Sequence, residues 1–171
     1  RTGKGDSVDV AQYEAMLRRE GFYALNYLNT GALPVREGSH STSSAGYGTY
    51  ICKDGVPIYT LILGPGVVRA ALPVFGLEYG SELFPEGTPV IPFGSEAGEA
   101  LEKAMEAFFA AHPAEEAERI LLDAGVPCSR IYTYEMAERD PHYLARESFT
   151  AWQSSYDDSM VRGVNVVPRM K

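Results

Sequence analysis

A short turn signal constrains the fold of this chain more than any other feature of its sequence. Asp54-Gly55 lies between two runs that are rich in β-forming residues, 49–53 and 56–63. An Asp-Gly pair in this setting is a strong signal for a tight hairpin, because glycine adopts the positive φ angle that the turn requires. We therefore predict an antiparallel hairpin formed by these two runs.

The most regular hydrophobic periodicity in the sequence predicts a helix over residues 97–111. Apolar residues recur there at steps of three and four, and charged residues, Glu102 among them, occupy the opposite face. A second helix is expected to begin at Pro113 and to end near Gly125, because proline is favoured at the first turn of a helix and glycine just after the last.

The remaining segments complete an alternating pattern. A long helix is predicted over residues 8–29, and its second half is apolar on almost every side, so it needs cover from other protein. The other expected elements are an irregular segment at 30–48, a helix at 66–77, a loop at 78–92, a strand at 126–133, short helices at 134–138 and 141–145, and strands at 148–154 and 160–167. This order predicts an α+β fold in which antiparallel hairpins pack against helices.

The charge and hydropathy of the chain exclude several classes of partner. The formal net charge is −8, whereas a nucleic-acid-binding domain needs a basic surface that displaces counterions. The sequence contains no apolar run of about 18 residues, the length that a membrane-spanning helix needs. We expect a cytoplasmic protein without nucleic-acid or membrane partners. The chain runs from Arg1 to Lys171 without an initial Met, and we expect it to be part of a longer polypeptide.

The two cysteines do not indicate a metal site or a disulfide framework. Cys52 and Cys128 are far apart in sequence, and neither belongs to a pair with the spacing of zinc ligands. We expect both to be reduced, buried thiols, and we predict no metal ligands in this chain.

The residues by themselves do not assemble a complete catalytic site. His40 lies in the hydroxyl-rich run "SHSTSS" without a carboxylate beside it in sequence, and such runs are typical of loops. His112 precedes Pro113 and is expected to cap a helix, whereas His142 is expected at the surface. The Asp54 side chain is explained by its turn. "GPG" at 64–66 lacks the spacing and the lysine of a phosphate-binding loop. We therefore assign no catalytic residue to this chain.

Three longer stretches resemble one enzyme family. "RTGKGDSVDVAQYEAML" (1–17) is similar to the segment with which family III CoA-transferases leave their large domain, "YGTYICKDG" (47–55) to the hairpin that opens their small domain, and "AGVPCSRIYTYEMAERDPHYLARESF" (124–149) to the end of that domain. These stretches follow the family order and span nearly the whole chain. "FPEGTPVI" (84–91) most resembles members that act on L-carnitine.

The resemblance implies a fold and a reaction. Residues 1–30 would form a linker helix from a large CoA-binding domain, and residues 31–171 would form the small α+β domain. In this family an Asp carboxylate attacks an acyl-CoA thioester, and the resulting anhydride leads to an enzyme–CoA thioester. That Asp belongs to the large domain. The resemblance further implies an interlocked homodimer, a carboxylic acid acceptor such as carnitine, and coenzyme A thioester as a substrate, with no tightly bound cofactor.

The resemblance also places one segment of this chain beside the substrate. In the family, a loop near the first hairpin closes over the reacting thioester, and here it corresponds to residues 43–48, with Ala45, Gly46, Tyr47 and Gly48 expected next to the substrate. The two glycines would let backbone N–H groups face a developing oxyanion. Tyr47 would pack on the acyl group or on a quaternary ammonium.

Two alternatives remain open from the sequence. The chain could be the small domain of an α-methylacyl-CoA racemase-like member, which would need an Asp/His pair from the large domain. It could also be a stand-alone, non-catalytic ligand-binding or assembly module.

Overall fold

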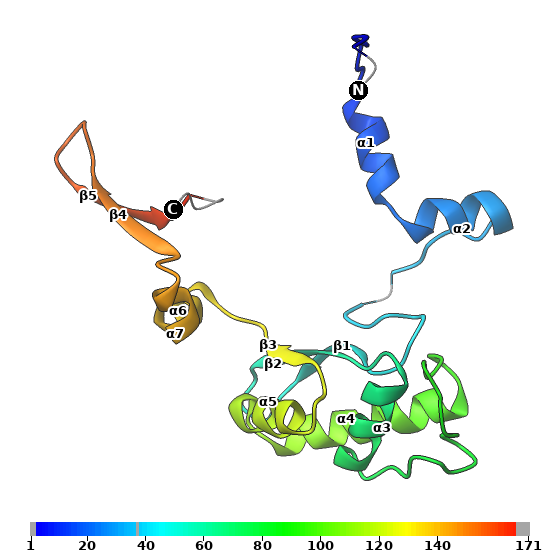
Figure 1. Cartoon of the computed structure of the whole chain (residues 1–171). Coiled ribbons are helices and arrows are strands. Elements are labelled where there is room, and N and C mark those ends of the chain that lie inside the picture. The colour runs from blue at the N-terminus through cyan, green and yellow to red at the C-terminus, as the bar shows by residue number, and fades with distance from the viewer. Residues whose placement is uncertain (1–2, 37, 167–171) are drawn as a thin grey trace. The chain divides into compact units, whose positions relative to one another are not determined.

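The computed structural model describes residues 3–36 and 38–166. The chain divides into two units, Arg1–Gly38 and Ser39–Lys171, which are both drawn in Figure 1. Unit 1 contains two helices, and unit 2 contains all the described strands together with the other helices. The boundary that the resemblance places between residues 30 and 31 stays a prediction.

Unit 1 corrects one expectation. The single helix predicted over residues 8–29 is wrong, because the segment forms two helices, α1 (Gln12–Arg19) and α2 (Phe22–Thr30). Gly21 separates them with φ 58° and ψ −120°, a conformation that glycine tolerates and that a helix does not contain. The apolar stripe continues through this glycine, so periodicity alone conceals the break. No residue of either helix is buried.

Unit 2 is built on a three-stranded antiparallel sheet in the order β1-β2-β3. Its strands are β1 (Tyr47–Ile51), β2 (Pro57–Leu61) and β3 (Cys128–Arg130). The predicted hairpin is confirmed, with Gly55 at φ 80° in its turn. Asp54 does more than the turn requires: its Oδ1 accepts from the Val56 N–H at 3.3 Å, and its Oδ2 accepts from the Ala114 N–H at 3.1 Å. This carboxylate therefore caps a helix that begins 60 residues later.

Three helices cover one face of the sheet, as Figure 1 shows. They are α3 (Pro65–Val74), α4 (Glu96–Ala111) and α5 (Ala114–Asp123). The predicted apolar stripe of α4 is confirmed, because Leu101, Met105 and Phe109 are fully buried. The helix ends as expected, with His112 at its C-cap. The main core of unit 2 lies between these helices and the side chains on the inner face of β1 and β2.

The last part of unit 2 follows the predicted order. It consists of α6 (Tyr134–Arg139), α7 (Pro141–Ala145), β4 (Phe149–Gln153) and β5 (Met160–Val164). Asp140 caps α7 by accepting from the His142 N–H at 2.8 Å, as expected for an Asp-Pro helix start. β4 and β5 pair as an antiparallel hairpin, and Val167, the predicted end of the last strand, lies outside the described residues. The α+β fold class is confirmed.

Both cysteines are free thiols. Cys52 is buried, and Cys128 is half-buried with its Sγ 3.8 Å from the carbonyl of Glu118. Burial is the main cause that raises the pKa of each thiol to about 11, and Asp54 and Glu118 respectively add to the rise. Because the pKa of each thiol is higher in the folded chain than in the unfolded chain, the folded chain holds these protons more tightly. Each thiol's contribution to the free energy of unfolding is therefore complete below about pH 8.5 and is lost as the pH rises toward 11.

These thiols are expected to react slowly in the folded chain. At pH 8 the thiolate is the reactive species, so alkylation by iodoacetamide should be about a hundredfold slower than in the chain unfolded in urea. The rate should then climb with pH up to about pH 11. Mass spectrometry of quenched samples measures both rates. Equal rates in folded and unfolded chains would contradict the burial of these groups.

Candidate functional site

Part of the segment expected to be an irregular loop continues the sheet instead. The N–H of Ser41 donates to the carbonyl of Tyr47 at 2.8 Å, and the N–H of Thr49 donates to the carbonyl of Ser39 at 3.0 Å. His40 and Gly48 form the bridge between these bonds. Residues 39–41 therefore lie antiparallel along the free edge of β1, and the turn 42–46 connects the two. This arrangement places the His40 ring against the backbone of Gly48.

Glu102 is the group around which the segment is arranged. Its Oε1 accepts from the Gly46 N–H at 2.7 Å, and the Tyr50 hydroxyl donates to the same carboxylate at 2.9 Å and 3.0 Å. The Nδ1 of His40 lies 3.6 Å from Oε2. The Glu102 side chain is only 16% exposed. The expectation that this residue belongs to a solvated helix face is therefore wrong.

The sequence carries no local signal for this cluster. Glu102 is 56 residues from Gly46 and 52 residues from Tyr50, and its neighbours on α4 are ordinary surface carboxylates. The residues meet because β1 packs on α4, a contact that periodicity does not specify. His40 has no carboxylate near it in the sequence, whereas the fold brings Glu102 beside it.

The surroundings keep the Tyr50 hydroxyl protonated. Burial is the largest cause that raises the pKa of Tyr50 above its ordinary value of 10, and the charge and hydrogen bond of Glu102 raise it further. The ring stacks on Phe109 with centroids 5.0 Å apart. The His40 ring meets Tyr50 edge-on at 4.9 Å. Tyr50 is therefore a fixed, neutral hydrogen-bond donor to Glu102.

Ser41, Ser43 and Ser44, which follow His40, use their hydroxyls elsewhere. Ser41 and Ser43 share a hydrogen bond of 2.7 Å between their Oγ atoms, and the buried Ser44 hydroxyl donates to the carbonyl of Ala45 at 3.2 Å. A serine nucleophile would need its hydroxyl on the histidine ring. The geometry thus agrees with the structural interpretation of this run.

Two of the four residues expected beside the substrate serve the interior of the unit. The Ala45 side chain is fully buried, and its N–H donates to the carbonyl of Ile91 at 2.9 Å. The N–H of Gly46 donates to Glu102 at 2.7 Å, a partner within the unit, and its place beside an oxyanion stays a prediction. The Gly46 carbonyl accepts from Ile62 and Thr60 as well.

Glycine at position 48 is explained by a close approach of the chain to itself. A Cβ atom at Gly48 would lie 2.6 Å from the Nδ1 of His40 and 3.0 Å from its Cα. Contacts this short do not occur between real side chains, so only glycine fits where residues 39–41 cross β1. The absence of a side chain at Gly48 thus allows residues 39–41 to pack against β1.

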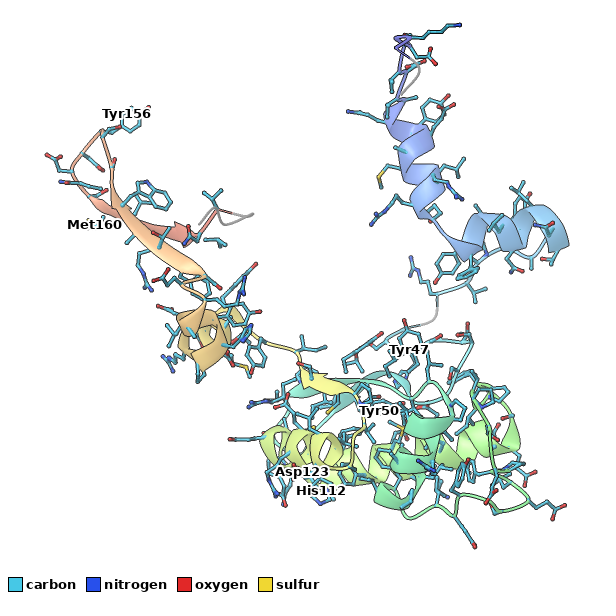
Figure 2. The ribbon with its side chains drawn as sticks, viewed as in Figure 1. Tyr47, Tyr50, His112, Asp123, Tyr156 and Met160 are labelled. Carbon is cyan, nitrogen blue, oxygen red and sulfur yellow. The ribbon has the colours of Figure 1, made fainter. Side chains whose placement is uncertain are left out.

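Tyr47 is the member of the four that presents a side chain at the surface. It is half-buried, and its ring lies edge-on to Tyr59 at a centroid distance of 5.9 Å. A side-chain hydrogen bond with Tyr47 is the main cause that raises the pKa of Tyr59. Figure 2 shows Tyr47 on the side of the sheet away from the helices, whereas Tyr50 points among them. The Tyr47–Tyr59 pair therefore forms an aromatic surface with two hydroxyl groups.

Open hollows lie elsewhere in unit 2, one along α5 and one lined by residues between Arg130 and Pro141. Among residues 3–36 and 38–166, no three His, Cys, Asp or Glu side chains are arranged to hold a metal ion. The hollow along α5 has a volume of about 570 Å³ and is lined by both acidic and basic side chains, among them Glu115, Glu116, Glu118, Asp123, Arg119 and Arg130. No helix in the described part of the chain is both long and apolar enough to cross a membrane.

Comparison with known proteins decides the family. The model of CoA-transferase family III matches residues 1–171, the whole chain. The chain belongs to CoA-transferase family III. It is also 36% identical over 177 residues to the bile acid CoA-transferase BaiK from Clostridium scindens. The alignment covers 100% of this chain and 40% of BaiK, so the chain spans well under half the length of this CoA-transferase.

Solved structures support the fold. A CAIB/BAIF family protein from Brucella suis matches with a TM-score of 0.62 and 23% identity, over 99% of this chain and 42% of that protein. Rv3272 from M. tuberculosis matches with a TM-score of 0.63 and 15% identity, over 100% and 43% of the respective chains. The resemblance to family III CoA-transferases noted from the sequence is confirmed by the family model and by the likeness to BaiK.

Proposed function

We propose that this chain is the small domain of an enzyme that moves coenzyme A between carboxylic acids. The observation that carries the proposal is the likeness to BaiK, which extends over the whole chain yet covers 40% of that transferase. The proposal places the attacking Asp and the CoA-binding surface outside residues 1–171. It also places the enzyme in the cytoplasm.

The proposed reaction proceeds by covalent catalysis. The Asp carboxylate attacks the acyl-CoA carbonyl, the C–S bond breaks, and the departure of CoA thiolate leaves an acyl–aspartyl anhydride. The thiolate then attacks the aspartyl carbonyl, which forms an enzyme–CoA thioester and releases the first acid. The carboxylate of the acceptor acid attacks that thioester, which breaks its C–S bond, expels CoA thiolate and forms a second anhydride. The thiolate then attacks the acceptor acyl carbonyl of this anhydride, which yields the new acyl-CoA and restores the Asp carboxylate.

The role proposed for this chain is to cover the cleft with segment 43–48. Tyr47 is the residue that would contact the acyl group or the acceptor, because its side chain reaches the surface. Since the N–H of Gly46 already donates to Glu102, further donors that stabilise an oxyanion would come from other residues. No residue of this chain is assigned a covalent role.

Two acceptor acids are supported by different observations. The aromatic faces of Tyr47 and Tyr59 suit a quaternary ammonium, which favours carnitine as the acceptor. The identity to BaiK, a bile acid CoA-transferase, favours a bile acid. Both compounds carry the carboxylate that the reaction needs, and the first proposal remains the carnitine-type transfer.

The proposal includes an interlocked homodimer. The support is the exposure of large apolar side chains in unit 1, such as Phe22 at 87% and Leu28 at 77%. Burying surface of this kind against a partner chain is favourable by about 25 cal/mol per Å² of apolar area.

An assay of CoA transfer tests the proposal. The longer gene product is expected to convert butyrobetainyl-CoA and carnitine to carnitinyl-CoA, and parallel reactions with a bile acid acceptor decide between the two substrates. Residues 1–171 alone are expected to give no product above the buffer control. Mass spectrometry of the CoA esters measures the outcome. Turnover by residues 1–171 alone would overturn the assignment of the attacking Asp to another part of the protein.

A further inference from the structure

The Glu102 carboxylate contacts residues before, within and after the turn 42–46. It accepts from the Gly46 N–H at 2.7 Å and from the Tyr50 hydroxyl at 2.9 Å, and it faces His40 at 3.6 Å. His40 precedes the turn 42–46, Gly46 is the last residue of that turn, and Tyr50 follows it within β1. A single side chain of α4 therefore touches both sides of the segment that carries Tyr47.

The carboxylate is itself held firmly. Its neighbours on α4, Leu101 and Met105, are fully buried, so the helix cannot shift without opening the core. Tyr50 is fixed by stacking on Phe109 at 5.0 Å. A functional residue is placed accurately when the groups behind it are locked by packing and hydrogen bonds. Glu102 meets that requirement for the Tyr47 segment.

The bond to Gly46 is one that this segment cannot easily replace. Gly46 is buried and has φ 73°, and its N–H points toward α4, where it donates to Glu102. A buried N–H without a partner is costly, and a hydrogen bond to a charged acceptor is stronger than one between neutral groups. Without Glu102, the turn would have to move to expose this N–H to water.

We propose that Glu102 is a positioning residue that fixes the turn 42–46 and thereby determines where Tyr47 lies. The importance of Tyr47 for the substrate rests on the proposed function. The effect of Glu102 on the position of the turn does not rest on the proposed function, because it depends only on contacts within unit 2. The two statements can therefore fail separately.

Amide hydrogen exchange of the 171-residue chain, followed by NMR, tests the hold on the turn. In Glu102→Ala the Gly46 N–H is expected to exchange at least about tenfold faster than in the unchanged chain. In Glu102→Gln the side-chain amide oxygen still accepts the bond, so exchange should stay within about threefold. Glu99→Ala, an exposed position on the same helix, serves as the matched control and should leave exchange unchanged.

A reference amide separates a local effect from general unfolding. The N–H of Val126 donates to the carbonyl of Leu121 at 2.8 Å and lies at the end of α5. Its exchange is expected to stay unchanged in Glu102→Ala. Equal acceleration of both amides, or no acceleration of Gly46, would overturn the proposal. Equal loss in Glu102→Ala and Glu102→Gln would overturn it as well.

Kinetics of the longer gene product test the consequence for Tyr47. Glu102→Ala is expected to lower kcat/KM at least about tenfold, with Glu102→Gln restoring it to within about threefold. Adding Tyr47→Ala to Glu102→Ala should cost little more, because both changes remove the same placed side chain. Fully additive losses would overturn the link to Tyr47. Absence of transfer by the unchanged protein would instead refute the proposed function, while the exchange data would still decide the role of Glu102.

Discussion

Replacing Phe109 with alanine is expected to lower the free energy of unfolding of unit 2 by about 3–5 kcal/mol, the usual cost of emptying a large aromatic site in a core. The Phe109 side chain is fully buried on α4. It stacks on Tyr50 at 5.0 Å and meets Phe108 edge-on at 5.3 Å. Its loss would therefore leave a cavity beneath the residue that donates to Glu102.

Urea unfolding followed by far-UV circular dichroism measures this cost. A loss of this size is a large part of the 5–15 kcal/mol that typically separates folded from unfolded domains, so partial unfolding at room temperature is an expected outcome. Phe93→Ala is the matched control, because Phe93 is 43% exposed and should cost less than about 1 kcal/mol. Equal costs at the two positions would contradict the central place of Phe109 in the core.

Replacing Gly46 with alanine is expected to lower the free energy of unfolding by about 2–5 kcal/mol. Gly46 has φ 73°, and a residue with a Cβ loses about 1–2 kcal/mol in that left-handed conformation. The new Cβ would also lie 2.7 Å from the Cδ1 of Ile62, which is fully buried. Overpacking of this kind adds about 1–3 kcal/mol. The turn would have to shift, and the bond from the Gly46 N–H to Glu102 would lengthen or break.

Thermal unfolding and the exchange rate of amide 46 measure the effect of Gly46→Ala together. Gly66→Ala is the matched control, because Gly66 lies in α3 with open space around it and without a positive φ. Alanine favours the helix there, so a neutral result or a gain of about 0.5–1 kcal/mol is expected. A neutral result at Gly46 would show that the turn does not need the conformation described.

The elements of unit 2 were largely predictable from local patterns. The hairpin around Gly55, the helix of Leu101, Met105 and Phe109, and the Asp140 cap each follow from a physical rule that acts within a few residues. The resemblance to CoA-transferase family III also rested on contiguous stretches. Local rules of this kind depend on the backbone preferences of each residue and on the one buried face of a helix or strand. Residues that are neighbours in the sequence specify both.

The site was less predictable, because its residues act through contacts between distant parts of the chain. The family resemblance placed segment 43–48 beside the substrate, but it did not predict that the N–H of Gly46 faces Glu102 or that the side chain of Ala45 is buried. The break at Gly21 was missed for a different reason. Glycine fits a helical stripe and a helix end equally well, so the pattern could not separate the two.

Short-range periodicity and matched stretches in the sequence were enough to predict most of the helices and strands, their apolar faces and the family that the chain resembles. The capping of the distant helix at Ala114 by Asp54 and the bond from Gly46 to Glu102 before Tyr47 became visible in the folded chain alone. A carboxylate looks the same in sequence whether it faces water or a buried N–H. The packing of β1 on α4 is what distinguishes the two.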